Sequence, residues 1–525
     1  MKKISSVFLL LVLLCSNLLS SISAASKVDS ALNDQILYFG NGTEPKDLDP
    51  HIVTGVPESH ILMALLEGLV IRHPEGLDPL PGVAKNWVIS DDGKTYTFYL
   101  RDAFWSNGDP VTARDFVWAW KRMLTPSLGS KYPDMLYDVV NAEKFNRVYS
   151  SCGTKEDPCD GHVTFSVEAN DDSTITVTDI SESGTKYLLS QLEGKAPKNG
   201  FVTFNDAKSL GGNITAEVLN QEYQIASIIN ENVYTIEAKD TGGNIVKTNS
   251  QDIEEGSSKV MASYRGLKDF TKVGVKALDE KSLEVQLRNP APYFLGLLAH
   301  YTTRPVHKPT IEKFGDIDTI GSQWTSPENF VGNGPFTLEE WELKKVIKVR
   351  KNELYWDSKK VKLKEIHFFP ISNVITEDRM FRTGQLHVTS TVPPEKVETY
   401  FEKYPDLIHS DPYYGTYYLR VNVKKSPFDK KLVRKALSLS IDRKLIVEKV
   451  TKGGQAPAFS FTPPDANSYF PPTSLDFNPE LAKSFLKEAG FSGENFPTFE
   501  LLYNTSEGHQ KLAQAVQWMW KKNLN

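Results

Sequence analysis

The residues of this sequence that could carry out chemistry are scattered rather than grouped. No serine nucleophile elbow, zinc-type HExxH helix, phosphate-binding loop or dinucleotide-binding glycine motif is present. Asp91 and Asp92 stand beside Gly93, a pattern that is typical of a turn. The histidines considered as ligands lack the i,i+4 spacing of a metal site; they are His60, His73, His300, His307 and His387. We therefore expect no catalytic residue, no metal site and no cofactor. An exported hydrolase stays open only because carboxylates that meet in the fold escape a sequence scan.

The N-terminus has the pattern of a signal peptide, which we place at residues 1–25. Met1–Lys3 supplies positive charge, Val7–Leu14 is a short apolar run, and Ser23–Ala25 offers small residues for cleavage. We therefore expect export to the periplasm. Cys15 raises the alternative of a lipid anchor at the cell surface, although the bulky residues before it do not fit a lipobox.

Only two cysteines remain after processing, Cys152 and Cys159. In an oxidising compartment they favour a local disulfide, and their spacing disfavours a CxxC redox or metal site. No later apolar stretch approaches the ~20 residues of a membrane helix, which predicts a soluble mature chain.

Length and charge limit the remaining possibilities. The 525 residues exceed what one hydrophobic core usually serves, so at least two lobes are expected. The formal net charge is −6 without a long basic block, which argues against a nucleic-acid partner.

The hydrophobic pattern predicts α/β units on both sides of a β-rich insertion. Before about residue 145, Thr95–Leu100 reads as a strand and Thr112–Arg122 as an amphipathic helix. Between about 147 and 262 the sequence resembles a small sandwich or an array of hairpins, with strands such as Val163–Val167 and Val233–Glu237. After about residue 270 the α/β pattern resumes. It predicts a strand at Ser282–Leu287 and a strand followed by a helix between Pro427 and Val450.

One part of the sequence carries a specific family pattern. Its segments are Pro81–Ala84, Trp87, Asp91–Arg101, Trp105–Gly108, Pro110–Ala113 and Asp115–Val117. Together they resemble the signature of the family 5 extracellular solute-binding proteins. Thr112 with Asp115 reads as a capping box that starts a helix, so we interpret the pattern as building the fold rather than lining a site.

Further matches to that family follow along the chain. They are Thr54–Ser59, Leu66–Leu69, Pro292–Phe294, Gly332–Phe336, Tyr355–Trp356, Arg382–Gly384, Asn422, Arg434–Leu437, Ile441–Arg443, Phe461–Pro464 and Leu501–Thr505. Within the family, the chain looks most similar to the oligopeptide-binding members of peptide ABC importers.

The resemblance implies a fold and a function. The fold is an α/β two-lobed clamp of the type II periplasmic-binding-protein class, with a third domain and the β-rich insertion. Lobe I comprises 26–66 and 308–412, the second domain is 67–307 with the insertion at 147–262, and lobe III is 413–525. The function is capture of extended oligopeptides for an ABC importer, as a monomer that meets permease subunits in the inner membrane and is not an enzyme.

Position by position, the resemblance also implies peptide-binding residues. Thr54, Gly55 and Val56 match a strand that hydrogen-bonds the peptide main chain, and Tyr132 matches a tyrosine that faces the ligand. Ser390 and Thr391 match a polar segment of the opposite lobe. Thr416 and Tyr417 match the strand that begins the third domain, although an aromatic run is more often packing than ligand surface.

The resemblance leaves three matters open. Relatives continue beyond Asn525 with an acidic anchor for the peptide's ammonium group, so we expect an incomplete lobe III, either through truncation or in a degenerate paralogue. Related proteins bind nickel complexes, haem or sugars, and nickel is disfavoured because no histidines cluster. Two other functions remain: a peptide-binding chaperone or sensor without transport, and a surface interaction protein acting through the insertion.

Overall fold

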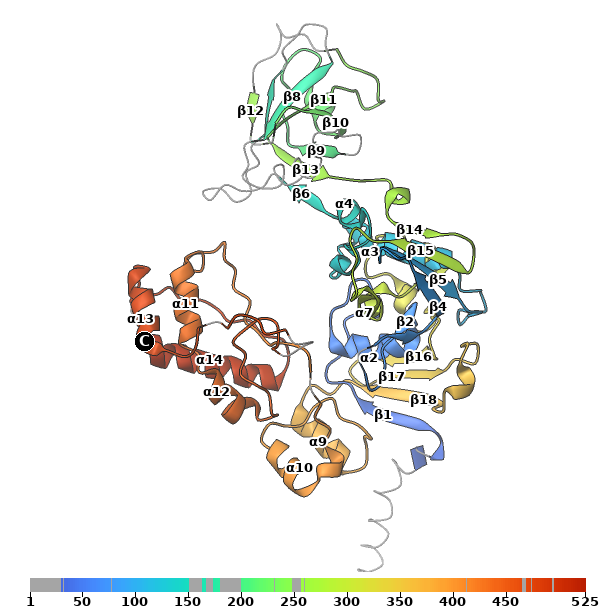
Figure 1. The fold of residues 1–525 in the computed structure, drawn as a ribbon, viewed down its shortest axis with the longest axis vertical. Helices are drawn as coiled ribbons and strands as arrows, with labels where there is room; N and C mark the ends of the chain where they lie inside the picture. The colour runs from blue at the N-terminus through green and yellow to red at the C-terminus, as the bar shows by residue number, and fades with distance from the viewer. Residues whose placement is uncertain are drawn as a thin grey trace, which may run out of the picture. The chain divides into compact units, whose positions relative to one another are not determined.

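The computed structural model (Figure 1) describes residues 30–31, 33–76, 78–150, 163–166, 173–179, 200–230, 232–247, 256–258, 260–411, 413–464, 469–473, 475–492 and 495–525. The chain divides into two compact units. Unit 1 contains the chain up to Pro45, Glu340–Lys348 and Leu363–Asn525, whereas unit 2 contains Lys46–Glu339 and Val349–Lys362. The bounds expected for the three lobes stay a prediction.

A four-stranded antiparallel sheet forms the centre of unit 2. Its strands, in spatial order, are β14 (Val275–Ala277), β15 (Ser282–Gln286), β5 (Thr95–Leu100) and β4 (Ala84–Ile89). The turn between β4 and β5 contains Gly93 at φ 68°, and its N–H donates to Ser90 O at 2.8 Å. The strand expected at Thr95–Leu100 is confirmed, and the one at Ser282–Leu287 ends one residue earlier than expected.

Helix α3 (Ala113–Leu124) covers part of this core. Its start is fixed by a capping box in which Thr112 N–H donates to Asp115 Oδ2 at 2.7 Å, as the sequence predicts. Phe116 and Trp120 are fully buried. The other α-helices in the described part of unit 2 are α2 (Val56–Leu65), α4 (Ala142–Asn146), α6 (Ala216–Leu219), α7 (Phe294–Leu298) and α8 (Lys308–Phe314). A hairpin joins β2 (Val70–Ile71) to β3 (Leu80–Pro81).

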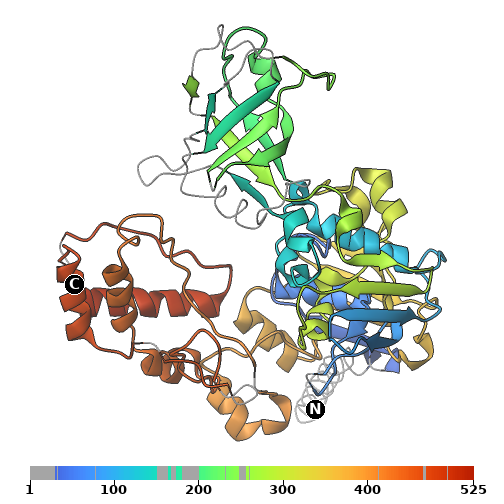
Figure 2. The same ribbon diagram turned by 45° about the horizontal axis from the view of Figure 1, so that its top comes forward.

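The insertion is a single antiparallel sheet of eight strands. In spatial order they are β12 (Gly256–Ser258), β7 (Val163–Ser166), β8 (Thr174–Asp179), β11 (Val233–Glu237), β10 (Glu222–Ile228), β9 (Phe201–Asn205), β13 (Met261–Arg265) and β6 (Val148–Ser150). Figure 2 shows these strands gathered around one interior. The predicted β-rich character is therefore confirmed.

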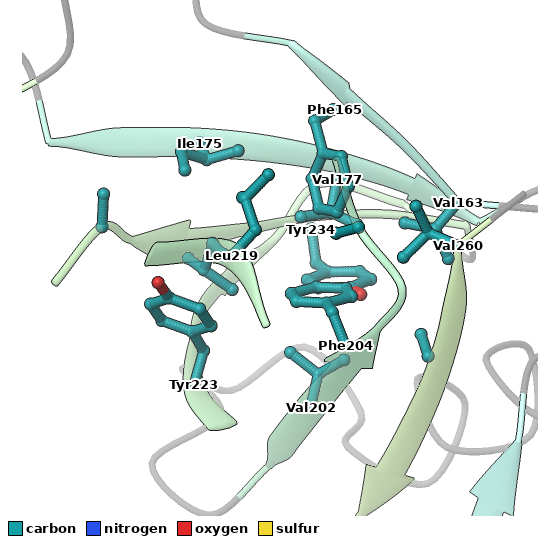
Figure 3. Close-up of a cluster of buried hydrophobic side chains, with 14 of the residues drawn as sticks. Val163, Phe165, Ile175, Val177, Val202, Phe204, Leu219, Tyr223, Tyr234 and Val260 are labelled. Carbon is teal, nitrogen blue, oxygen red and sulfur yellow. The ribbon is translucent and has the colours of Figure 1, made fainter. Parts of the chain in front are cut away.

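The insertion has a hydrophobic core of its own. Every residue of this core comes from between Val163 and Tyr264, and Figure 3 shows side chains of different strands, such as Phe165, Val177 and Phe204, turned toward one another. The chain enters the insertion on β6 and leaves it on β13, and these two strands pair directly. The insertion is thus a module joined to unit 2 by two adjacent strands.

A second four-stranded sheet includes the strands that link the two units. In spatial order it consists of β1 (Ile36–Gly40), β18 (Glu365–Phe369), β17 (Val346–Lys351) and β16 (Phe336–Glu342). β1 and β18 run parallel. β16 and β17 each begin in one unit and end in the other. Helices α9 (Val374–Arg382) and α10 (Val397–Lys403) follow β18 in unit 1.

The remainder of unit 1 is helical. Its helices are α11 (Lys431–Leu439), α12 (Arg443–Ile446) with a π-helical turn at Val447–Thr451, α13 (Pro479–Glu488) and α14 (Glu507–Leu524). Within the described part of 413–525 no strand is formed. The strands expected at Thr416–Tyr417 and near Pro427 are therefore wrong. A strand needs a neighbour with which to share hydrogen bonds, and the described residues there provide none.

Candidate functional site

The segment Thr54–Val56 lies at the start of helix α2. Val56 is the first helical residue and is 65% exposed, while Gly55 is the N-cap with φ −85° and ψ 153°. The expectation that these three residues form a strand is wrong. Pro57 explains the difference, because its fixed φ and missing N–H favour the first turn of a helix.

The carbonyl oxygens of Val53, Thr54 and Gly55 already accept hydrogen bonds. Tyr301 donates its hydroxyl to Val53 O at 3.0 Å, and the Tyr132 hydroxyl reaches Thr54 O at 3.5 Å. Gly55 O accepts the N–H of Ser59 at 3.1 Å. The structure therefore brings Tyr132 and Thr54 together, as expected of two residues of one site. It also adds Tyr301, which no local sequence signal marks.

The main-chain N–H groups of the same segment are unused. Within the residues that the structure describes, the amides of Thr54, Gly55 and Val56 donate no hydrogen bond. Thr54 is exposed and Gly55 is half-buried. Three consecutive amide donors can bind the carbonyl or carboxylate oxygens of a ligand.

A histidine completes the aromatic wall beside this segment. The His300 ring lies 4.2 Å from the Tyr301 ring and 5.2 Å from the Tyr132 ring, measured between centroids. Burial, with the positive charges of Arg72 and Arg304, lowers the pKa of His300 to about 4. Its Nδ1 accepts the N–H of Thr302 at 3.3 Å, so the neutral ring carries its proton on Nε2. Burial also raises the pKa of both tyrosines, which keeps their hydroxyls as donors.

A buried ion pair anchors the loop that leads into the segment. Both terminal nitrogens of Arg122 donate to the carboxylate of Asp49, at 2.8 and 2.6 Å, and both side chains are almost fully buried. His51 Nδ1 lies 2.9 Å from Arg122 Nη1. Arginine can only donate, so this nitrogen is the acceptor. Burial, then the Arg122 charge, lowers the pKa of His51 to about 3.

In unit 1, Ser390 is held by a single carboxylate, and Thr391 follows it in the chain. Ser390 donates its N–H to Glu377 Oε1 at 3.0 Å and its hydroxyl to Glu377 Oε2 at 2.9 Å. Glu377 is fully buried, and burial raises its pKa. Gly40 lies directly against it, where a β-carbon would overlap Oε1.

Tyr417, next to Thr416, contacts a different part of unit 1 than Ser390 does. The Tyr417 ring is 52% exposed and lies 4.9 Å from the His509 ring, and burial raises the Tyr417 pKa. In the described part of unit 1, no hydrogen bond or ring contact joins these residues to the Ser390 segment. Tyr413, Tyr414 and Tyr418 are exposed as well. The aromatic run is thus accessible surface within its unit rather than core.

The remaining expectations concern residues that the structure does not describe, a metal site and a membrane helix. Cys15, Cys152, Cys159 and the signal peptide at 1–25 lie outside the described residues. Over the described ranges, no group of three or more histidine, cysteine, aspartate or glutamate side chains could hold a metal ion. In that same part of the chain, no helix combines the length and apolar character needed to cross a membrane.

Three segments that carry the family resemblance meet around Glu67. Trp356 Nε1 donates to its carboxylate at 2.7 Å, and the Tyr355 hydroxyl donates to the other oxygen. Asn333 forms two bonds with the Glu67 main chain, at 2.8 and 2.9 Å. Burial raises the Glu67 pKa. These residues hold the fold of unit 2 together, which explains why they identify a family without contacting the candidate site.

Comparison with known proteins extends this resemblance to the whole chain. The model of the bacterial extracellular solute-binding proteins, family 5 (middle), matches residues 78–248 and 233–525. The periplasmic oligopeptide-binding protein OppA of Salmonella typhimurium is 32% identical over 528 residues, covering 98% of this chain and 74% of OppA. The periplasmic murein peptide-binding protein MppA of Escherichia coli is 29% identical over 525 residues, which cover 97% of this chain and 74% of MppA.

Solved structures agree. The Haemophilus influenzae OppA complex with the peptide RPPGFSPFR is 29% identical and aligns with a TM-score of 0.64, over 94% of this chain and 74% of that one. An oligopeptide-binding protein of Borrelia burgdorferi gives a TM-score of 0.66 at 29% identity, with the same coverage. The predicted α/β fold class is confirmed by these likenesses.

Proposed function

The chain belongs to the family 5 bacterial extracellular solute-binding proteins, and we propose that it is the peptide-binding component of an ABC-type importer. It captures extended oligopeptides outside the cytoplasmic membrane and presents them to permease subunits. Relatives that match over nearly the whole chain are named for oligopeptide or murein peptide binding, and one solved relative holds a nine-residue peptide.

The observation that carries this proposal is the row of unused amides at Thr54–Val56, beside Tyr132. An extended peptide offers main-chain oxygens whatever its sequence, so donors of this kind give affinity without selecting side chains. Val56 adds an exposed apolar side chain at the same place. Ser390, Thr391, Thr416 and Tyr417 complete the proposed contact set.

The working cycle follows from a hinge. Strands β16 and β17 pass between the units, and rotation about them closes the protein on its ligand. Closure gives the transporter a shape that differs from the empty protein. We further propose that the protein is a monomer exported to the periplasm, with a disulfide between Cys152 and Cys159. The alternative is a lipid anchor at the cell surface through Cys15.

Thermal unfolding of the purified full chain tests the function. A mixed pool of peptides of about two to seven residues should raise the melting temperature in proportion to concentration, because ligand that binds only the folded state stabilises it by mass action. Free amino acids at the same concentration are the control. Absence of any shift with the pool, together with a shift from sugars, haem or nickel complexes, would assign the protein to another ligand class.

A further inference from the structure

We infer that unit 1 carries a surface for anionic phospholipid, made of five lysines in and before helix α11. These lysines, which we name the lysine patch, are Lys424, Lys425, Lys430, Lys431 and Lys435. The patch is separate from the residues proposed to contact peptide. The inference goes beyond the proposed function and uses only its location outside the cytoplasmic membrane.

Positive charge is concentrated in the last part of this sequence. Between residues 413 and 525, 16 lysines and arginines stand against 10 aspartates and glutamates, a formal net charge of +6, although the whole chain carries −6. The rest of the chain therefore carries −12. Within Lys424–Lys435, Asp429 is the single acidic residue among six basic ones. A negatively charged surface attracts this region and repels the remainder.

The main chain beneath the patch is held in place by Arg434. Its Nη1 donates to Phe428 O at 2.7 Å and to Asp429 O at 2.9 Å, which fastens the loop before α11 to the helix. Phe428 N–H in turn donates to Lys425 O at 2.8 Å. Arg434, the one arginine of this stretch, is thus used inside the fold.

Contacts with the neighbouring helix α13 orient two of the lysines. α11 packs against α13, and Figure 1 shows the two helices side by side. Lys430 Nζ donates to Ala489 O at 2.9 Å and lies 4.6 Å from the centre of the Phe491 ring. Lys435 Nζ lies 5.4 Å from the centre of the Phe485 ring. A carbonyl oxygen and aromatic rings do not neutralise these two positive charges.

The patch lysines form no ion pair within the described part of unit 1. The lysines of that unit that do form ion pairs are Lys345, Lys348, Lys396, Lys483 and Lys511. Of the patch, Lys435 is half-buried and the other four lysines are exposed. Unpaired ammonium groups so close together repel one another, and an anionic surface relieves this repulsion.

The positions of these charges weaken their own helix. Lys430 is the N-cap and Lys431 the first residue of α11, where the positive end of the helix dipole favours acidic side chains, and the first turn contains none. Lys431 and Lys435 are four residues apart, a spacing at which like charges repel. Helix α13 has the ordinary arrangement, with Glu480 in its first turn and Lys487 in its last. Charges that do not serve the helix are available for a partner.

The choice of lysine favours a lipid surface over a protein partner. Arginine binds carboxylates through two parallel hydrogen bonds and is enriched in protein interfaces, where lysine is depleted. A lysine ammonium is a compact, strongly hydrated charge that attracts phosphate headgroups without a fixed geometry. Clusters of about four to eight basic residues are typical of proteins that bind anionic lipid.

Vesicle co-sedimentation tests the inference. The probe is a vesicle of phosphatidylethanolamine and phosphatidylglycerol in a ratio of about two to one. The full chain should bind it at about 50 mM salt and be released at about 0.5 M, because ions screen exposed charges. Vesicles of neutral phosphatidylcholine are the control, and they measure any contribution of the apolar run Val7–Leu14.

A variant with four substitutions locates the binding. It leaves Lys430 and Arg434, which contact the fold, in place. The patch variant combines Lys424→Gln, Lys425→Gln, Lys431→Gln and Lys435→Gln. Each lysine near an anionic surface strengthens binding by up to about fivefold, so the partition coefficient should fall at least about tenfold.

A control variant removes the same number of charges from exposed positions elsewhere in unit 1. It combines Lys344→Gln, Lys364→Gln, Lys403→Gln and Lys449→Gln. Its partition coefficient should fall less than about threefold, because these lysines lie outside the patch. Both variants should keep the parental melting temperature and its rise with the peptide pool. If the patch variant unfolds early, Lys424→Gln with Lys425→Gln, both in the loop, repeats the test with an expected fall of at least about fivefold.

Three outcomes would overturn the inference. Equal losses in the patch and control variants would show that net charge decides binding, and equal binding of the parent protein to neutral and anionic vesicles would show that charge does not. A parent protein that ignores the vesicles but binds poly-glutamate through the patch would have an acidic protein as its partner. The peptide-dependent rise in melting temperature is measured separately, so none of these outcomes decides the proposed function.

Discussion

The carboxylate of Glu58 lies directly over Gly55, in the space that a β-carbon on residue 55 would fill. Its other oxygen, Oε1, accepts the N–H of Lys46 at 2.8 Å, and the residue is 5% exposed. One side chain from the first turn of α2 thus closes the loop that begins at Lys46 and ends at the candidate site. Glycine at position 55 is required by this packing and not by an unusual φ.

Replacing Gly55 with alanine should therefore loosen the loop. The new methyl group displaces the Glu58 carboxylate and breaks its bond to Lys46, which should lower the free energy of unfolding by about 1–2 kcal/mol, since a bond to a charged group outweighs the entropic gain from alanine. Urea denaturation measures this cost. Gly296→Ala is the control, because nothing lies within 4 Å of its β-carbon position. A Gly55→Ala protein as stable as the control would show that Glu58 moves without cost.

Gly334 should tolerate alanine less well than Gly55. A β-carbon at Gly334 would overlap the main chain at the end of α2, around Leu65 and Leu66, whereas at Gly55 it meets a side chain that can rotate. Main-chain atoms cannot turn away, so Gly334→Ala should cost about 3 kcal/mol or more, or prevent folding. The same denaturation experiment compares the two variants. Equal costs would contradict the distinction between rigid and flexible neighbours.

The buried pair of Asp49 and Arg122 should dominate the polar contribution to stability. Asp49→Ala leaves the Arg122 guanidinium buried without its partner, and an uncompensated buried charge costs about 3–5 kcal/mol. Glu312→Ala on α8 breaks an exposed ion pair with Lys308 and should cost less than about 1 kcal/mol. If the two substitutions lower the free energy of unfolding by the same small amount in chemical denaturation, water must reach Arg122 in solution.

Acid should destabilise the protein through His51. Its pKa is about 3 in the fold and near 6.5 when unfolded, so between these values the unfolded chain binds the extra proton. This contribution is complete above pH 6.5 and is lost as pH falls toward 3, on the order of 5 kcal/mol in total.

The variant His51→Asn keeps an acceptor near Arg122 and does not titrate. Its free energy of unfolding, measured from pH 7 to pH 4.5, should fall less steeply than that of the parent protein. His73→Asn, a surface position, should retain the parental slope. Parallel slopes for all three proteins would contradict a lowered His51 pKa in the fold.

Local sequence patterns correctly predicted the helices and strands that are determined by residues close together in the chain. The alternation in Thr95–Leu100 and the capping box of Thr112 with Asp115 gave a strand and a helix where they are found. The strand expected at Thr54–Val56 failed because Pro57 starts a helix there, and the one at Thr416–Tyr417 failed because a sequence does not reveal whether a pairing neighbour is present.

The candidate site was predictable only in part. Tyr132 and Thr54 came from the family resemblance, and the structure places them in contact. Tyr301 and Glu377 had no signal, because a tyrosine or glutamate that caps distant main chain looks like any other in sequence. Their importance arises from contacts across 248 and 13 residues, which only the fold brings about.

The insertion should be removable without loss of peptide binding. Its core contains residues from 163 to 264 alone, and Val148 pairs with Arg265 where the module joins unit 2. A short glycine–serine link from Val148 to Arg265 should therefore give a protein with an unchanged peptide-dependent rise in melting temperature. Loss of that rise, with unit 2 still folded by circular dichroism, would assign the module a direct part in binding and favour function through the insertion.

The pairing of β6 with β13 also bears on how such a chain can change over generations. The module is one uninterrupted stretch of chain, so a single in-frame gain or deletion in the gene adds or removes all of it. Because its two ends emerge side by side, the flanking chain can rejoin after such an event. The rest of unit 2 keeps its strand order through that event. Ancestry with and without the module can therefore be separated by one mutational step.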